Sequence, residues 1–524
     1  MSLKTSTRVH ALSKPAPQVI SLSLLDATTA NFALTSAIWL FDASIQPNQD
    51  INLSEHLRKT LGATLNAYPQ WTGQIKAITS TDGSAPDEAA HLPAHARRFG
   101  RIYTKFGYEQ DPGVSFTTAT CSSTLAELYP ISSRHAVWEL DKSDLNALVS
   151  QESIADPFHA HERNETGVLK PVMAIQLSEL ACGGFALAVK IAHPLADISA
   201  LATFMKNWGA VSRAALLGDP EPVLKPVFDP SKLDRLAAGN INSSQPSSKV
   251  LKQLEGLPLH RYDWWASAAT CPWGMTIPEP FKEDVTPAGR IMPWTEWDVR
   301  APVPRSIIRF THEQVDFLWK AANTGSTSGI SRHDAIVAHV WSCITRARKT
   351  DDSGPVHCDL VYGVRSPLQL GSGFVGSPMF MINVEMAADV VGTEGGSHFH
   401  KVAGRIRETI RRIQPSDIAA HLHSIAYEKS PQRIWQAFLG RRHVMLTSWA
   451  RAGVYDVDFG LGLLRYVDDV MPSMDGIVVV KEGAGPGRCG NDGGGGWTEN
   501  GVDVDVRIGR EDMERLLEDC ALLP

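Results

Sequence analysis

Residues 184–218, GFALAVKIAHPLADISALATFMKNWGAVSRAALLG, change from one apolar period to another within a few positions. Apolar side chains alternate from Phe185 to Ile191, which predicts a strand because successive strand side chains point to opposite faces. From Ile198 to Trp208 the apolar residues recur at helical spacing on one face. The stretch therefore predicts a strand that leads through a short turn directly into a helix.

His193 lies in that turn, and Asp197 stands where the helix begins. A neutral imidazole at the junction of a strand and a helix can act as a general base toward a hydroxyl or an amine near neutral pH. Two plainer explanations compete with this one. His193 can be a packed core side chain, and Asp197 can be an ordinary helix N-cap, since aspartate is a preferred capping residue. The stretch alone leaves these alternatives open.

Composition narrows the class of protein. The 524 residues are 43% hydrophobic and 20% charged with a net charge of −7, as expected for a globular protein with more than one core. No block of Lys and Arg indicates a nucleic-acid or membrane partner. The N-terminal residues lack the apolar segment of a signal peptide, and the seven cysteines are scattered. We therefore expect a cytoplasmic monomer with reduced thiols and no membrane or nucleic-acid partner.

Elements with clear signals lie on both sides of an irregular region. LSEHLRKTLGATLNAYPQW (residues 53–71) predicts an early helix that Ser54 can cap. Residues 218–300 open with a stretch rich in Pro, Asn and Ser and are predicted to be a crossover between two halves. Beyond it, Thr311 with Gln314 and Ser331 with Asp334 match capping boxes ahead of two helices, and HFHKVAGRIRETIRRI (398–413) predicts a third.

Two strands are predicted near the C-terminus, at residues 476–483 and 501–509. The second alternates valine with charged residues, which predicts that one of its faces is exposed to water. Residues 484–496 between them are so rich in glycine that we expect a slack loop. The mixture of elements predicts an α+β protein in two halves.

Several motifs do not support the function that they suggest at first sight. GSGFVG (371–376) matches G-x-G-x-x-G, but the residues after it form a strand pattern, whereas a dinucleotide fingerprint leads into a helix. The three H-x-H pairs lack the flanking pattern of a metal site, so we expect no bound metal. These pairs are His159/His161, His398/His400 and His421/His423.

A second informative stretch is LTSWARAGVYDVDFGLGLLRYV, residues 446–467. It contains a tight turn at Asp458-Phe459-Gly460-Leu461-Gly462, preceded by the aromatic residues Trp449 and Tyr455. The plain explanation is a loop that packs its aromatic side chains into the core.

H-x-x-x-D at 193–197 followed by D-F-G-x-G at 458–462 resembles the BAHD superfamily of acyl-CoA-dependent acyltransferases, which pair H-x-x-x-D with D-F-G-W-G. The flanking residues agree over most of the chain. SLSLLD, LGATLNAYPQWTGQI and DAIVAHVWSCITRAR are similar to segments of that superfamily, and LTSWARAGVYDVDFGLG is similar to fungal trichothecene acetyltransferases.

The resemblance implies two domains of the chloramphenicol-acetyltransferase type, each a mixed sheet flanked by helices, with a channel between them. Residues 1–217 would form the domain with H-x-x-x-D and residues 301–524 the domain with D-F-G-x-G. In such enzymes the histidine deprotonates the acceptor, which attacks the acyl-CoA thioester directly in a ternary complex.

By this resemblance His193 is the general base. The donor is an acyl-CoA co-substrate, acetyl-CoA first, with no permanently bound cofactor, and the acceptor is a hydroxyl of a fungal secondary metabolite. Two alternatives remain, a condensation-type enzyme that uses a carrier-tethered acyl group and a catalytically silent small-molecule binder.

The resemblance also implies roles for other residues. Asp197 would pair with Arg365 and hold the histidine loop, and the residues of the turn, Asp458, Phe459, Gly460 and Gly462, would shape a loop near the channel. Ser448 and Trp449 would line the acceptor side. The chain departs from the family at Leu461, where plant members have tryptophan, and at Phe374-Val375-Gly376-Ser377, where many members read Y-F-G-N.

Overall fold

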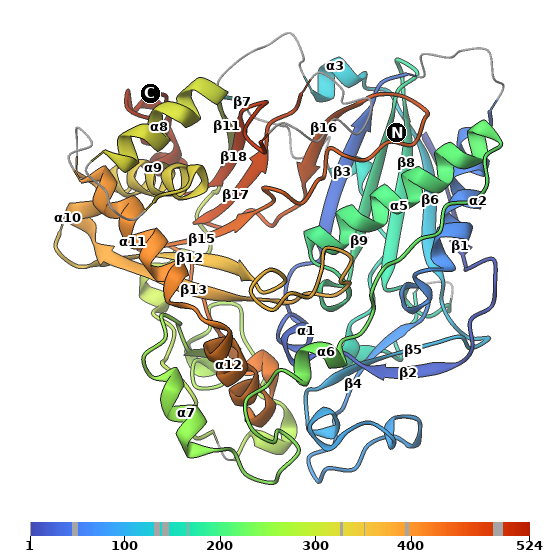
Figure 1. Cartoon of the computed structure of the whole chain (residues 1–524), viewed down its shortest axis with the longest axis horizontal. Helices are drawn as coiled ribbons and strands as arrows, with labels where there is room; N and C mark the ends of the chain where they lie inside the picture. Colours follow the sequence, from blue (N-terminus) through green and yellow to red (C-terminus); the bar gives the residue numbers. More distant parts are fainter. Residues whose placement is uncertain are drawn as a thin grey trace.

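Two large sheets with helices on their outer faces make up most of the molecule (Figure 1). The predicted α+β class is confirmed. The structure is a computed structural model, and it describes residues 2–43, 51–129, 137–138, 146–164, 167–283, 285–324, 329–350, 352–393, 398–485 and 496–524. No helix in these ranges is long and apolar enough to cross a membrane.

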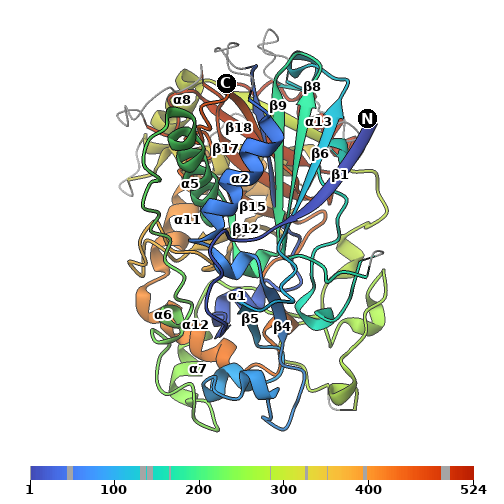
Figure 2. The same ribbon diagram turned by 90° about the vertical axis from the view of Figure 1, so that its right-hand side faces the viewer.

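The sheet at the right of Figure 1 has six strands in the order β1-β6-β8-β9-β3-β16. Their bounds are Ser2–Val9 (β1), Val114–Cys121 (β6), Met173–Leu180 (β8), Phe185–Ile191 (β9), Thr35–Phe41 (β3) and Leu464–Asp469 (β16). The strand predicted from residues 184–193 is β9, and the helix after it is α5, Ile198–Leu217. The early helix, α2 (Leu53–Leu65), packs beside α5 on the same side of this sheet (Figure 2).

The other sheet has seven strands in the order β13-β12-β15-β17-β18-β11-β7. Their bounds are Met379–Ala387, Pro355–Gly363, His443–Ser448, Ile477–Glu482, Val502–Arg507, Arg305–Phe310 and Val137–Trp138. The helices α8 (His312–Asn323), α9 (Arg332–Ala347), α11 (Phe399–Arg412) and α13 (Arg510–Glu518) pack together beside it. Both predicted capping boxes are present, at the first turns of α8 and α9.

Each large sheet contains a strand from the other half of the sequence. Strand β16 pairs with β3, and the short strand β7 pairs with β11. The two halves are thus linked by exchanged strands as well as by the crossover. The domain boundaries at residues 217 and 301 stay a prediction.

The remaining elements are short or lie at the lower part of Figure 1. The crossover contains α6 (Ser231–Asp234), α7 (Ser248–Leu254) and β10 (Tyr262–Asp263), which pairs with β14 (Ile434–Trp435). A three-stranded sheet consists of β2 (Gln18–Ser21), β5 (Ile102–Phe106) and β4 (Gln74–Ala77). The other helices are α1 (Leu24–Thr28), α3 (Leu125–Leu128), α10 (Ala388–Val391) and α12 (Pro415–Tyr427).

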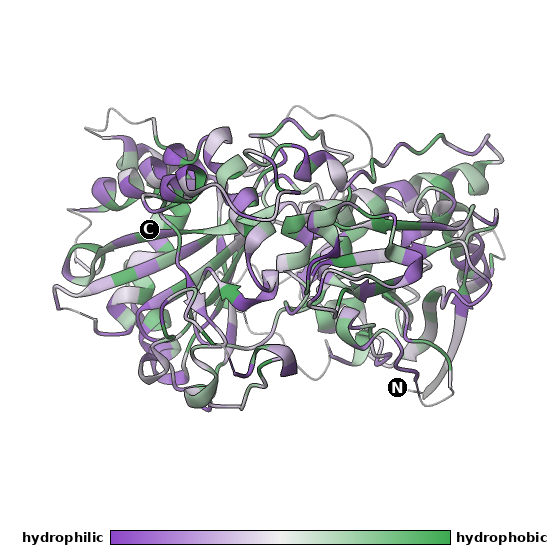
Figure 3. Ribbon diagram, turned by 90° about the horizontal axis from the view of Figure 1, so that it is seen from below, coloured by the Kyte–Doolittle hydropathy of each residue, from purple (hydrophilic) through white to green (hydrophobic). Residues whose placement is uncertain are grey.

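The apolar residues gather in one large core for each half. Seen from below, hydrophobic segments run through the strands of both sheets, and hydrophilic segments gather on the helices at the outer edge of the C-terminal half (Figure 3). Burial of these apolar faces is the main stabilising contribution to such a fold.

The prediction that Ser54 caps α2 is wrong. The cap is Asn52, whose side chain accepts a hydrogen bond from the N–H of Glu55 at 3.1 Å. Asparagine and serine both cap well, so the sequence alone allowed either Asn52 or Ser54 as the cap. Most of the predicted glycine-rich loop, residues 486–495, lies outside the described residues.

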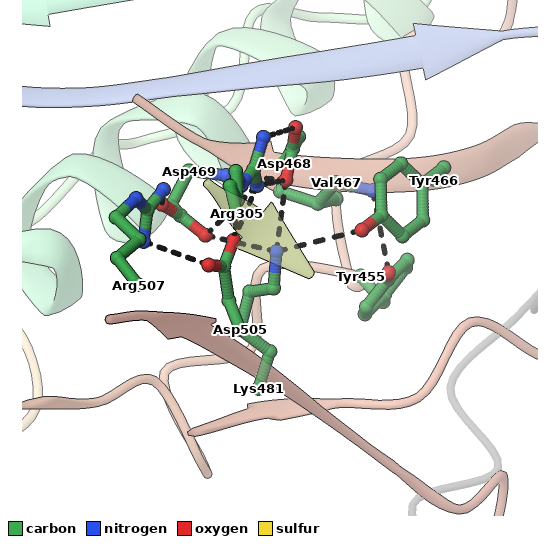
Figure 4. A network of polar contacts seen from close by, with 9 residues as sticks. All are labelled: Arg305, Tyr455, Tyr466, Val467, Asp468, Asp469, Lys481, Asp505 and Arg507. Carbon is green, nitrogen blue, oxygen red and sulfur yellow. Dashed lines mark hydrogen bonds and ion pairs between the residues drawn. The ribbon is translucent and has the colours of Figure 1, made fainter. Parts of the chain in front are cut away.

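The prediction that one face of β18 is exposed to water is also wrong. Asp503 and Asp505 are 0% exposed and Arg507 is 1% exposed. This face turns toward β16 of the other sheet, where three cationic and three acidic side chains form a buried network (Figure 4). The members of this interdomain charge network are Arg305, Lys481, Arg507, Asp468, Asp469 and Asp505.

The interdomain charge network is balanced, which explains how it can be buried. Nζ of Lys481 lies 2.9 Å from Asp468 and 3.0 Å from Asp469, and Arg507 lies 2.5 Å from Asp469. The neighbouring cations hold the pKa of both aspartates below its usual value despite their burial, and the aspartates raise the pKa of Lys481. A buried charge is tolerated when it is paired in this way.

Candidate active site

His193 lies in a single turn of 3-10 helix, His193–Leu195, between β9 and α5. The strand cannot continue through Pro194, which has no N–H to donate to a neighbouring strand. Ala196 returns to extended backbone, and Asp197 then caps α5. The sequence thus places the imidazole at the end of a buried strand and just before a long helix.

The ring of His193 is held from two sides. Its Nδ1 lies 2.8 Å from Oγ of Ser377, and the edge of the ring meets Phe32 at a centroid distance of 5.6 Å. The hydroxyl of Ser377 can donate or accept, so this contact fits either neutral tautomer of the ring. In the tautomer with the proton on Nδ1, the Nε2 atom, which makes no hydrogen bond within the described residues, keeps its lone pair.

The surroundings of His193 favour the neutral ring. Burial lowers the pKa of His193 below its usual value, and the nearby carboxylate of Asp197 opposes that shift only in part. His193 as a residue is half-buried. At neutral pH the group can accept a proton, which is what a general base requires.

Asp197 performs two structural tasks at once. Its Oδ1 accepts a hydrogen bond from the N–H of Ala200 at 3.0 Å and so caps α5. The same carboxylate pairs with the guanidinium of Arg365 through both oxygens, with Nη2 2.9 Å from Oδ1. Each side chain of this pair is only 15% exposed. The N-cap and the ion pair, posed as alternatives by the sequence, are both present.

Arg365 also ties the start of α5 to the loop of residues 374–377. Its Nη2 donates to the carbonyl of Phe374 at 3.0 Å and to that of Gly376 at 3.2 Å. The carbonyl of Gly376 accepts a further hydrogen bond from the N–H of Asp197 at 3.0 Å. Because Ser377 follows directly, the same contacts position the hydroxyl that faces His193.

Sequence reasoning missed Ser377 and its partner Asp26 as site residues. The N–H of Ser377 donates to Oδ1 of Asp26 at 2.6 Å, and Oδ2 of Asp26 accepts from the N–H and the hydroxyl of Ser23 in a capping box of α1. Burial raises the pKa of Asp26 to about 6. Gly376 has a φ of +139°, and a Cβ there would approach Asp26 to 3.0 Å. The only sequence signals were SLSLLD and the altered Y-F-G-N segment.

The turn at 458–462 packs against the C-terminal part of α5, away from its N-cap. Phe459 is fully buried, with ring centroids 5.0 Å from Trp208 and 5.7 Å from Phe41. Asp458 bonds the N–H of Gly460 at 2.8 Å, and Gly460 has a φ of +72°. A Cβ at Gly462 would lie 2.1 Å from the carbonyl of Asp42, so glycine is required there.

Ser448 and Trp449, predicted on the acceptor side, lie at the end of β15. The hydroxyl of Ser448 accepts from the N–H of Ala450 at 3.3 Å, and Trp449 is 4% exposed within the core of the N-terminal half. Within the described residues, the hydrogen bonds and ring contacts of His193 involve neither side chain.

A hollow lies beside the histidine where the two halves meet. Its free space is about 30 Å³, and it is partly open to solvent. Phe32, which contacts His193, and Thr28 line it from the N-terminal half, while Met379, Phe380 and Met381 of β13 line it from the C-terminal half. Its walls are mostly apolar, as in small-molecule sites, but its free space holds only about two water molecules, so a bound acceptor would have to widen it.

Two clusters among the described residues could hold a metal ion, and neither contains His193. Asp468, Asp469 and Asp505 belong to the interdomain charge network and are already matched by three cations. The other cluster consists of His260, Asp359 and His443.

Comparison with known proteins agrees with the arrangement. A family model described as "Transferase family" matches residues 110–252 and 279–522. The acyltransferase AFT15-1 of Alternaria alternata is 25% identical over 97% of this chain and 94% of its own length. The crystal structure of TRI101 of F. graminearum with ethyl coenzyme A has a TM-score of 0.63 at 17% identity, over 97% of this chain and 98% of the other. Vinorine synthase has a TM-score of 0.61 at 18% identity, over 99% and 97%.

Proposed function

The chain belongs to the Transferase family, the BAHD-type acyltransferases, and we propose that it transfers an acyl group from coenzyme A to a hydroxyl of a small molecule, with His193 as general base. Transfer of acyl groups follows from the family; the donor, the acceptor and the role of His193 are the proposal. The observation that carries it is the imidazole of His193, whose pKa burial lowers, bonded through Nδ1 to Ser377 and with Nε2 free of hydrogen bonds within the described residues.

The proposed reaction is a direct transfer. Nε2 of His193 takes the proton of the acceptor hydroxyl while the oxygen attacks the thioester carbonyl carbon, so that a C–O bond forms. The tetrahedral intermediate then expels the thiolate of coenzyme A as the C–S bond breaks. The protonated His193 returns its proton to that thiolate, which restores the neutral ring.

In this scheme the residues around His193 position it. Ser377 fixes the ring orientation, and the Asp197–Arg365 pair holds the turn and the loop of residues 374–377 together. The turn at 458–462 supports α5 from its other end. A base held within reach of the acceptor avoids the entropic cost of bringing the two together in the transition state.

The donor and the acceptor are proposed from the relatives and the hollow. Structures of TRI101 from F. graminearum contain coenzyme A together with deoxynivalenol or T-2 mycotoxin. We propose acetyl-CoA as the donor and a hydroxylated fungal secondary metabolite as the acceptor, held in the hollow between Phe32 and Met379–Met381. Ser448 and Trp449 stay proposed acceptor-side residues. We also propose a cytoplasmic monomer; the scattered cysteines fit a reducing compartment.

The test combines a panel of hydroxylated metabolites, deoxynivalenol among them, with acetyl-CoA and a longer acyl-CoA. Release of free coenzyme A is followed with a thiol reagent, and the product is identified by mass spectrometry. A product heavier than the acceptor by one acetyl group supports the proposal. The same acyl group transferred only from a carrier protein would favour a condensation-type enzyme instead.

A further inference from the structure

A cluster of histidines lies in the C-terminal half, outside the residues proposed for acyl transfer. Asp359 of β12, His443 at the start of β15 and His260 of the crossover bring their side chains together, with ligand atoms all within 4.8 Å of one another. They are 0%, 1% and 2% exposed, respectively. Three segments far apart in sequence thus meet at two imidazoles and one carboxylate.

The spacing of the three groups is longer than that of good hydrogen bonds. Nε2 of His260 lies 3.4 Å from Oδ1 of Asp359, and Nδ1 of His443 lies 3.3 Å from Oδ2. Nε2 of His260 is fully buried and makes no hydrogen bond. Neighbouring ligands of a tetrahedral Zn²⁺ ion with bonds of about 2.0–2.2 Å stand about 3.3–3.6 Å apart, which agrees with both separations.

The charge of Asp359 is not matched by a permanent cation. Within the described residues its ion-pair partners are His260 and His443, and no Lys or Arg is among them. Both imidazoles are buried beside the carboxylate. Neutral imidazoles and a carboxylate are the forms that bind a metal, and a divalent cation would offset the buried charge.

The carboxylate is also held as a metal ligand usually is. Nδ2 of Asn383 donates to Oδ1 of Asp359 at 2.9 Å, and the N–H of Phe438 donates to Oδ2 at 3.1 Å. Such second contacts fix the direction of a ligand. The ring of His357 stacks on that of His443 at 4.4 Å and closes one side of the cluster.

We propose that His260, Asp359 and His443 bind a divalent transition metal of the zinc type, which fastens the crossover to β12 and β15. Two nitrogens and a carboxylate favour Zn²⁺, Co²⁺ or Ni²⁺ over Mg²⁺ or Ca²⁺. Arg261, next to His260, lines the hollow, as does Gln436, two residues before Phe438. The metal would thus stabilise the wall behind the proposed acceptor site. The inference does not depend on the proposed function.

Cobalt(II) is the probe for the test. The full chain, purified without a metal-affinity tag and stripped with a chelator, is titrated with CoCl₂ while visible absorption and metal content are measured. We expect one cobalt per chain, displacement by Zn²⁺ and a higher melting temperature with Zn²⁺. Asp359→Asn and His443→Gln should each weaken binding at least about tenfold, because loss of even an outer-shell partner of a ligand costs about that much.

His159→Gln is the matched control, because it removes a histidine of an exposed H-x-H pair that could take up metal adventitiously. Its binding should equal that of the wild type. Circular dichroism checks that the cluster variants fold. If they do not fold, the titration of the wild type still decides whether the protein binds one metal ion per chain. No stoichiometric uptake by the wild type, or equal uptake by folded cluster variants, would overturn the proposal and leave a cluster held by hydrogen-bonded protons.

Discussion

Arg365 donates to both carboxylate oxygens of Asp197, while Asp197 also caps helix α5. The pair lies 168 residues apart in sequence and joins the two halves beside His193. An aspartate that only capped a helix would need no arginine, and an aspartate that only paired with one could lie elsewhere. The double use explains why this position carries a carboxylate.

Replacing Asp197 separates the two uses. Asn caps almost as well as Asp but cannot form the ion pair. Because the pair is nearly buried, Asp197→Asn and Arg365→Ala should each lower the free energy of unfolding by about 3 kcal/mol. Urea denaturation with circular dichroism measures this. A loss below about 1 kcal/mol in both variants would leave only the cap.

Ser377→Ala tests whether the hydroxyl orients His193. Removing one hydrogen bond to the base should lower kcat about tenfold, while KM for acyl-CoA stays the same, because the bond matters for the orientation of the ring and not for donor binding. Ser306→Ala is the control, since Ser306 is equally buried and its hydroxyl makes no hydrogen bond. Equal kcat values for Ser377→Ala and the wild type would remove Ser377 from the account.

The pH dependence of kcat/KM tests the state of His193. A general base must be unprotonated, so activity falls as pH falls through its pKa. Burial lowers the pKa of His193, so the acid limb should lie below the ordinary value of 6.5. Asp26, with a pKa of about 6, could contribute a second limb, and Asp26→Asn should remove only that one. An acid limb centred above 6.5 would contradict the assignment.

The interdomain charge network should behave as a buried unit. Lys481→Met leaves Asp468 and Asp469 without their shared cation and should cost about 3–5 kcal/mol of unfolding free energy. Arg442→Ala removes an exposed pair with Asp352 and should cost less than about 1 kcal/mol. Urea denaturation compares the two. Similar losses would mean that the network contributes no more than a surface pair.

Local signals in the sequence were sufficient for the elements around His193. The alternation from Phe185 to Ile191 and the helical spacing from Ile198 gave β9 and α5 nearly to the residue. The capping boxes of α8 and α9 were found because each depends on residues three positions apart. Periodicity and caps depend on neighbours, which a single sequence contains.

Apart from the Asp197–Arg365 pair, which the family resemblance implied, contacts between distant segments could not be predicted from the sequence. Ser377 and Asp26 are 351 residues apart, and nothing near either one indicates the other. The alternating charges of β18 predicted a face exposed to water. The pattern was misleading because the charged residues that cover this face belong to β11, β16 and β17. His260, Asp359 and His443 likewise show no spacing typical of a metal site. Tertiary partners of this kind depend on the fold as a whole.

The most direct test of the account is the rate of acyl transfer by His193→Ala. The assay measures release of coenzyme A from acetyl-CoA in the presence of an acceptor found in the metabolite panel. The variant and the wild type are compared at equal concentrations of folded protein, which circular dichroism checks. Loss of a positioned general base predicts a rate lower by about 10²–10⁴-fold. The free energy of unfolding should stay within about 1 kcal/mol of the wild-type value. A folded His193→Ala variant that transfers the acyl group at nearly the wild-type rate would show that His193 is not the base.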